Sequence, residues 1–172
     1  MDSPHITLTG ERADLLATLA SHRWFLRNTL RDLTDEQAAA RTTVSELCLG
    51  GVIKHVARGE QNWVRFIVEG TSAIGAVSEE TLAAHAASFR MEPGETVHGL
   101  LADYDAVARE TDEIVAALPD LDASHPLPEA PWYEPGARWS ARRVLLHIIA
   151  ETAQHAGHAD ILREAIDGAK SM

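Results

Sequence analysis

Four long stretches of the chain repeat apolar residues at the three- to four-residue spacing of one helix face. These stretches span residues 11–32, 49–68, 97–118 and 141–166. Two shorter segments, 34–41 and 78–89, have the composition of connecting helices, and residues 70–75 have that of a loop. No stretch alternates apolar and polar residues for long enough to predict a β-strand. The pattern therefore predicts an all-α protein, most economically an antiparallel four-helix bundle with short connector helices.

Local signals define the last helix and the segment before it. Ser140 is a strong helix N-cap, and Gly168 is typical of a helix stop. Residues 119–139 hold five of the seven prolines, so we expect an irregular loop there. A loop of this length inside a compact domain is usually functional. We therefore expect Trp132 and Tyr133 to shape the mouth of a pocket.

Length and charge limit the classes of function. The 172 residues fit a single domain, residues 1–172. Lys and Arg number 15 against 26 Asp and Glu, a net charge of -11. We expect no nucleic-acid partner, because phosphate binding draws its affinity from clustered basic residues. No apolar run approaches the roughly 20 residues of a membrane span, and the first residues do not resemble a signal peptide. We expect a soluble cytoplasmic protein without a membrane partner.

The single cysteine, Cys48, excludes an intramolecular disulfide and a cysteine-rich zinc site. We interpret it as a small buried thiol rather than a nucleophile. Any thiol chemistry is then expected to use a thiol supplied from outside the chain. The Trp and Met residues on the helices are interpreted as core residues.

The last predicted helix carries a polar stripe. At about 100° per residue, His147, Glu151, His155 and His158 fall within about 80° of one another. Val144 lies on the same side, so a bundle would bury this stripe. Burying a carboxylate and several imidazoles without partners costs several kcal/mol. A bound divalent cation solves this problem, and so does a hydrogen-bonded polar network without metal; the spacing leaves both open.

A metal site would need a third ligand from another helix. Glu151 and His155, four residues apart, can reach one ion, and His55 is the best third candidate because its immediate neighbours are apolar. Three protein ligands leave positions open for water or substrate, as in catalytic sites. His158 is the candidate catalytic residue, either contacting the substrate or acting as a base; alternatively, it is a further metal ligand. His147 is expected to contact the metal ligands rather than the metal itself. We expect no functional role for the remaining histidines, His5, His22, His85, His98 and His125.

Two segments resemble a known family. They are residues 49–56, Leu-Gly-Gly-Val-Ile-Lys-His-Val, followed by Glu60 and Trp63, and residues 139–168. They resemble the DinB-like (YfiT-like) metalloenzyme superfamily, and most closely its actinobacterial branch related to mycothiol-dependent maleylpyruvate isomerase. The resemblance covers nearly the whole chain. It implies a four-helix bundle that binds a divalent metal, zinc or nickel, through the second and last long helices.

Carried over to this chain, the resemblance implies His55, Glu151 and His155 as metal ligands. Many relatives have His in place of Glu151, and a carboxylate there shifts the preference toward harder ions. The resemblance further implies that a low-molecular-weight thiol such as mycothiol, activated by the metal, attacks a small electrophile. We therefore expect a metal-dependent thiol S-transferase of a detoxification type that acts on a small-molecule substrate. The alternative is a non-catalytic metal-binding or stress-response bundle protein, and a homodimer is expected from the relatives.

Overall fold

The computed structural model describes residues 9–171, and this part of the chain is mostly helical, as predicted. Among the histidines, His5 lies outside the described residues. In chain order the elements are α1 (Glu11–Asn28), α2 (Asp35–Ala39), α3 (Leu49–Glu69), the 3-10 turn η1 (Gly70–Ala73), α4 (Glu79–Ala87), α5 (Val97–Ala117), β1 (Ser124–Pro126), β2 (Arg138–Ser140) and α6 (Ala141–Asp167).

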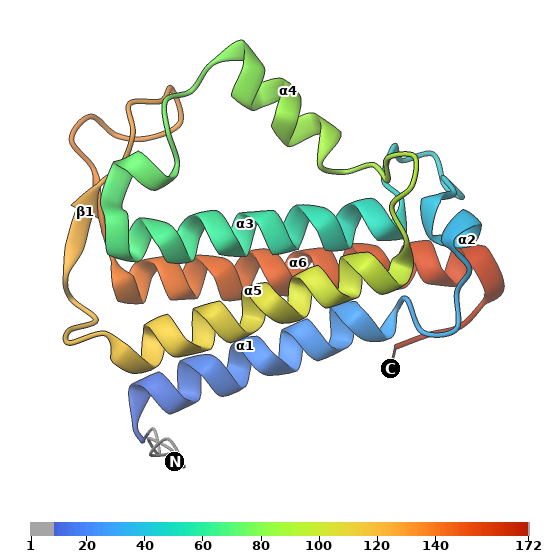
Figure 1. Ribbon diagram of the computed structural model, residues 1–172, viewed down its shortest axis with the longest axis horizontal. Helices are drawn as coiled ribbons and strands as arrows, with labels where there is room; N and C mark the ends of the chain where they lie inside the picture. Colours follow the sequence, from blue (N-terminus) through green and yellow to red (C-terminus); the bar gives the residue numbers. More distant parts are fainter. Residues whose placement is uncertain (1–8, 172) are drawn as a thin grey trace.

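The four long helices α1, α3, α5 and α6 lie side by side (Figure 1). Helix α6 packs against both α1 and α3, and α3 also packs against α5. The short helix α2 lies at the end of the molecule where α6 finishes, and the two strands lie at the opposite end (Figure 1). None of the helices in residues 9–171 is long and apolar enough to cross a membrane.

Capping groups fix several helix ends where the sequence predicts them. The Ser140 hydroxyl accepts a hydrogen bond from the Arg143 backbone N–H at 3.2 Å, which starts α6. Gly168 ends α6 with a φ of 77°, a left-handed conformation that glycine adopts without strain. Helix α1 is shorter than predicted. It ends at Asn28 because the chain then passes through turns to Asp32, whose φ of 59° is incompatible with an α-helix.

The prediction that the chain has no strand, and that residues 119–139 are irregular throughout, is wrong. Strand β1 pairs with β2 in antiparallel register, with His125 opposite Trp139. Each strand has three residues, which is too short for a period-two pattern to be visible in the sequence. The pairing closes the proline-rich segment into a loop that carries Trp132.

The core consists of two apolar clusters separated by a polar layer. One cluster gathers residues toward the α2 end of the long helices, and the other gathers residues toward the sheet. Every long helix contributes buried polar residues between them, namely Arg23, Glu60, Thr111, and on α6 both Thr152 and His155. The Arg23 guanidinium pairs with the Glu60 carboxylate, which also accepts a 2.7 Å hydrogen bond from the Thr111 hydroxyl. These contacts satisfy a charge that would otherwise be costly to bury.

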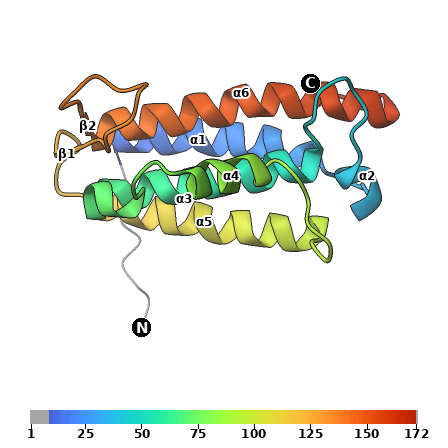
Figure 2. The ribbon, with the colours of Figure 1, turned by 90° about the horizontal axis from the view of Figure 1, so that it is seen from above.

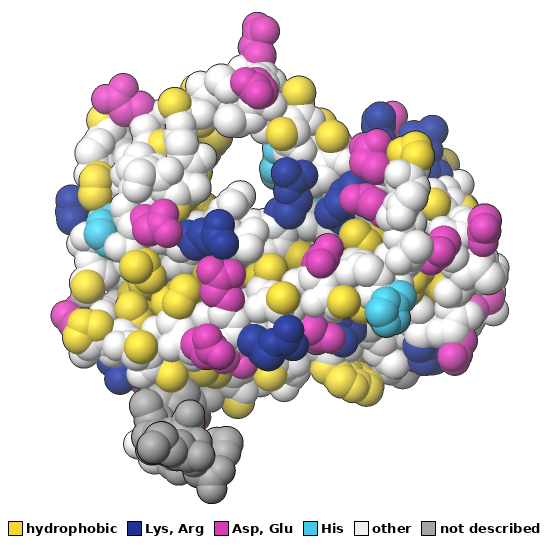
Figure 3. Space-filling model, viewed as in Figure 1, with side chains coloured by type: hydrophobic (Ala, Val, Ile, Leu, Met, Phe, Trp, Pro, Cys, Tyr) yellow, Lys and Arg dark blue, Asp and Glu magenta, His cyan; other side chains and the backbone are white. Residues whose placement is uncertain are grey.

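Helix α4 stands away from the other helices. It crosses over α3 as an arch, and none of its residues is buried (Figures 1 and 2). Figure 3 shows a hollow beneath the arch. The arch therefore covers one side of α3 without filling the space above it.

Two predictions about single residues have opposite outcomes. Cys48 is a buried free thiol, as predicted. The interpretation of the helical tryptophans as core is wrong for Trp24, whose side chain is 57% exposed on α1. The helix period places Trp24 next to the buried Arg23 rather than on the apolar stripe.

Candidate metal centre

The structure brings together the three residues predicted as metal ligands. His55 comes from α3, and Glu151 and His155 come from successive turns of α6, which packs against α3. One nitrogen or oxygen atom of each residue lies within 4.8 Å of the corresponding atoms of the other two. Within residues 9–171 no other group of three or more His, Cys, Asp or Glu residues converges in this way.

Hydrogen bonding determines which nitrogen of His55 is free. The Ser88 hydroxyl donates its one proton to the His85 carbonyl at 2.6 Å. The same oxygen lies 2.9 Å from His55 Nδ1, so it must accept the Nδ1–H. The neutral ring then carries its lone pair on Nε2. This is the arrangement by which proteins orient a metal-binding histidine.

His155 has a related arrangement. Its Nε2 lies 3.7 Å from Glu151 Oε2, and its Nδ1 lies 3.5 Å from His158 Nδ1. His158 thus contacts His155 on the side away from Glu151. The structure does not place His158 among the residues that line the adjacent cavity. The catalytic role of His158 stays a prediction.

Burial keeps the two imidazoles neutral. It lowers the pKa of His55 from 6.5 to about 3, and the neighbouring His155, His85 and Arg58 act in the same direction. Burial also lowers the pKa of His155, although the Glu151 carboxylate opposes this shift. Both rings are therefore unprotonated at neutral pH, the form that binds a metal ion.

Two imidazoles and one carboxylate form a donor set that fits a divalent first-row metal such as zinc or nickel. Ligands about 2.0–2.2 Å from a tetrahedral ion lie about 3.4 Å from one another. The 3.7 Å separation of the His155 and Glu151 atoms is close to this value. The residues present therefore fit a three-ligand site with at least one open position.

The open side faces a cavity of about 610 Å³. Helices α3 and α6 form its floor, the α4 arch covers it, and Trp132 of the proline-rich loop lies at its wall, as predicted. The same prediction is wrong for Tyr133, which does not line the cavity and packs near Trp139 instead. The candidate ligands line this cavity together with Ser88, His85, Trp63 and His147. A small molecule in the cavity would reach the open position directly.

The family model for mycothiol-S-transferase matches residues 14–168. The chain belongs to the mycothiol-S-transferase family. This family is part of the DinB-like superfamily, so the resemblance seen in the sequence is confirmed. A search of curated proteins finds no match.

Two residues beside His55 in this mycothiol-S-transferase family member were not predicted. His85, for which we expected no role, has its ring 4.9 Å from that of His55. The Phe89 ring stacks on His55 with centroids 3.8 Å apart. Both residues lie beside His55 because the chain returns to the start of α3 at the end of α4. The Gly50–Gly51 pair is the signal in the sequence: a Cβ on Gly51 would lie 1.9 Å from the Phe89 carbonyl oxygen, so only glycine permits this approach.

A second carboxylate at the cavity, Glu60, has a different role. It is 2% exposed, and its oxygens are engaged by Arg23 and Thr111. If the Glu60 carboxylate bound a metal instead of these partners, the Arg23 charge would be left buried and unpaired. Glu60 is therefore a structural residue, and Glu151 is the carboxylate available to a metal.

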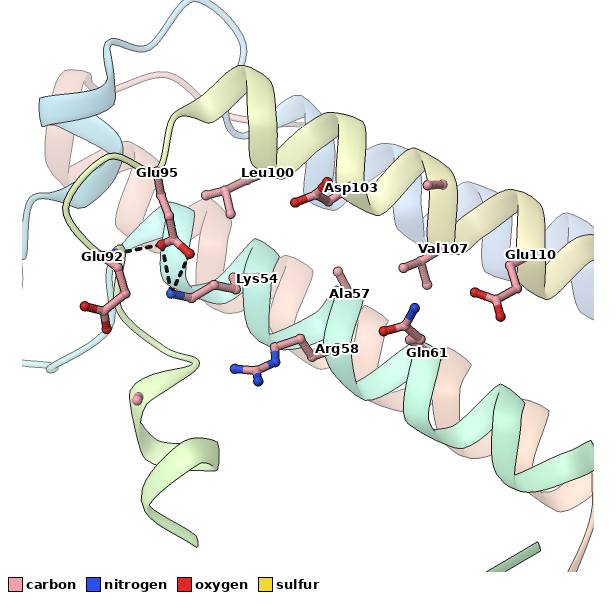
Figure 4. Close-up of a pocket in the computed structure, with 12 residues that line it drawn as sticks. Lys54, Ala57, Arg58, Gln61, Glu92, Glu95, Leu100, Asp103, Val107 and Glu110 are labelled. Atoms are coloured by element: carbon pink, nitrogen blue, oxygen red, sulfur yellow. Dashed lines mark hydrogen bonds and ion pairs between the residues drawn. The ribbon is translucent and has the colours of Figure 1, made fainter. Parts of the chain in front are cut away.

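A cavity of about 580 Å³ lies on the opposite flank of α3, facing α5 (Figure 4). Two of its charged groups engage each other: Lys54 Nζ lies 2.8 and 3.1 Å from the two Glu95 carboxylate oxygens. Glu95 also accepts a 2.6 Å hydrogen bond from the Glu92 backbone N–H. This second cavity contains no converging set of metal-binding groups among the described residues.

Proposed function

We propose that the protein is a divalent-metal-dependent thiol S-transferase that transfers the sulfur of mycothiol to a small electrophile. The observation that carries this proposal is the convergence of His55, Glu151 and His155 at the floor of a covered cavity. Membership of the mycothiol-S-transferase family supports the choice of thiol and reaction class. Zinc or nickel is the proposed metal, because two imidazoles accompany a single carboxylate.

A divalent cation bound here would supply positive charge that stabilises a thiolate at neutral pH. The chain's own residues would hold it through Nε2 of His55, Nε2 of His155 and the Glu151 carboxylate. Ser88 fixes the His55 tautomer, and His158 is proposed to orient His155 in the same way, or to exchange a proton with it.

The transfer step is a substitution at carbon and needs no oxidant or reductant. The sulfur forms a bond to an electrophilic carbon, and the bond between that carbon and its leaving group breaks. The leaving group takes the bonding electron pair, and the thiol proton passes to solvent. Cys48 is buried and not part of the cavity lining, so the sulfur comes from the mycothiol.

We also propose that α1, α3, α5 and α6 form the antiparallel four-helix bundle of the DinB-like fold. The packing of α6 on α1 and α3, and of α3 on α5, supports this arrangement. A homodimer and a cytoplasmic location remain predictions. Size-exclusion chromatography with light scattering would test the dimer.

The direct test is a thiol-consumption assay of the metal-loaded protein with mycothiol, bacillithiol or glutathione and one model electrophile. We expect metal-dependent consumption of mycothiol well above the uncatalysed rate, and less with the other two thiols. The absence of consumption with any thiol would contradict the proposal. That result would favour a non-catalytic metal-binding protein with the same fold.

A further inference from the structure

The cavity lining has two chemically different parts. One part is His55, Glu151 and His155. The other is aromatic: Trp63 and His147 lie on the same two helices nearer the strands, with their rings 4.9 Å apart, and Trp132 of the loop also lines the cavity. Aliphatic side chains extend this aromatic wall, namely those of Ile74, Val77, Leu82 and Ile148. His147 precedes Glu151 by four residues, about 6 Å along α6. The aromatic wall therefore begins one helical turn from the candidate metal ligands.

The inner part of this wall is rigidly packed. Trp63 stacks on Trp139 with ring centroids 4.8 Å apart and an interplanar angle of 21°. The Arg143 guanidinium lies 4.3 Å from the Trp139 ring centroid and holds that ring in turn. His147 points edge-on to both indoles at 4.9 and 5.0 Å. A wall that is already ordered loses little side-chain entropy when a ligand packs against it.

The outer part of the wall exposes apolar surface. Trp132 is 59% exposed, and Leu82 and Val77 on the arch side are 50% and 36% exposed. All three line the cavity. Covering this surface with an apolar group is favourable, roughly in proportion to the area removed from water. Flat aromatic groups suit it best, because stacked and edge-on geometries are both available.

The polar groups of the cavity suit the thiol substrate of the proposed reaction. Arg58 and Asn62 are exposed on α3, and Ser88 and His85 lie beside His55. A hydrophilic thiol compound can contact these groups with its sulfur at the candidate ligands. The carbon that accepts the sulfur then lies next to it, and the remainder of the electrophile extends toward Trp63 and Trp132.

We infer that the electrophile is a small compound whose reactive carbon bears a planar, apolar group, and that Trp63, Trp132 and His147 form the subsite for this group. The inference rests on the proposed function, because it assigns one of the two substrates of that reaction. Trp132 is the specificity-determining residue that can be changed with least risk to folding, since it is exposed on a loop.

Two chloroketones with the same reactive carbon test this subsite. The sulfur displaces chloride from 2-chloroacetophenone or from chloroacetone: a C–S bond forms, the C–Cl bond breaks, chloride leaves with the electron pair, and the thiol proton passes to buffer. We expect kcat/KM, divided by the uncatalysed rate, to favour the aryl compound at least about tenfold. Trp132→Ala should reduce this preference to about threefold or less. Trp24→Ala is the matched control, because Trp24 is equally exposed but lies outside the cavity, and it should keep the preference.

A binding measurement separates failure of the subsite from failure of the proposed function. Acetophenone has the aryl group without the leaving group, and its binding to the metal-free protein can be followed by ligand-observed NMR. We expect Trp132→Ala to weaken this binding at least about fivefold, and Trp24→Ala to leave it unchanged. Equal normalised rates for both chloroketones in the unaltered protein would overturn the subsite and leave the transferase intact. Without turnover, Trp132-dependent binding of acetophenone would still support the subsite, and Trp132-independent binding would overturn it.

Discussion

The two cavities on either side of α3 have similar volumes, about 610 and 580 Å³, but their linings differ in chemistry. On the α5 side, Lys54 and Glu95 form an ion pair with each other. On the α6 side, His55 and His155 are neutral and use their Nδ1 atoms for contacts within the protein, which leaves Nε2 for a ligand. Cavity volume therefore does not identify the functional site. A candidate site is identified instead by groups that converge and still have atoms free to bind a ligand.

The largest expected effect comes from removing a candidate ligand on the α6 side. His155→Ala should weaken zinc binding more than about 1,000-fold, because each of only three protein ligands supplies a large share of the binding free energy. Lys54→Ala, on the α5 side of the same helix, should leave zinc affinity within about twofold. Competition titrations of the metal-free proteins with a chromophoric chelator would measure both. Equal affinities in the two variants would remove the distinction between the cavities.

The two carboxylates of the α6-side cavity should have separate effects on stability and metal binding. Glu60→Ala should lower the free energy of unfolding by about 3–5 kcal/mol, because it leaves the Arg23 charge buried and unpaired. Glu151→Ala should change the unfolding free energy of the metal-free protein by less than about 1 kcal/mol, because Glu151 is partly exposed. Urea denaturation would measure this difference, and metal analysis should show that only Glu151→Ala loses the ion. A Glu151→Ala protein with full metal content would refute the ligand assignment.

Ser88 should have a smaller effect, through the orientation of His55. Ser88→Ala removes the acceptor of the Nδ1–H bond, so we expect zinc affinity to fall about 10- to 100-fold. Ser88→Thr keeps a hydroxyl and should recover most of the loss. Recovery separates positioning of the imidazole from a general disturbance of the segment after α4. If Thr and Ala behave alike, the hydrogen bond does not orient His55.

The last expected effect is on the pH dependence of the stability of the metal-free protein. In the folded metal-free protein the pKa of His55 is about 3, against 6.5 for an unperturbed histidine. Between these values the unfolded chain binds a proton that the folded protein does not, so stability falls as the pH drops from 6.5 toward 3. His55→Phe should flatten this dependence, and His98→Phe, at an exposed position on α5, should not. Urea denaturation of the metal-free proteins at pH 7, 6, 5 and 4 would show the two slopes.

The sequence was most informative where a pattern is long and local. Periodicity over about 20 residues predicted the positions of the four long helices, and the caps at Ser140 and Gly168 predicted the ends of α6. The stripe of Glu151 and His155 could be predicted for the same reason, since residues four apart share a helix face. The partner His55 was predicted from its apolar neighbours, and the structure brings it to the other two.

Features that depend on contacts between distant segments could not be predicted. The two strands have three residues each, and their pairing is set by the closure of the proline-rich loop. His85 and Phe89 lie beside His55 only because the arch returns to α3, and no local pattern encodes that path. The Gly50–Gly51 pair does not by itself indicate which segment approaches it. Its structural reason, the approach of the Phe89 carbonyl to Gly51, requires the fold.

The proposed function requires that His55, Glu151 and His155 hold a divalent metal that receives the sulfur of mycothiol. Cobalt(II) in place of the native metal reports on this directly, because a cobalt–thiolate bond produces a charge-transfer band in the near ultraviolet. We predict that one equivalent of mycothiol per bound cobalt generates this band in the unaltered protein and in Lys54→Ala. Binding of one cobalt ion without any spectral change on addition of mycothiol, or a band that persists in His155→Ala, would contradict the account.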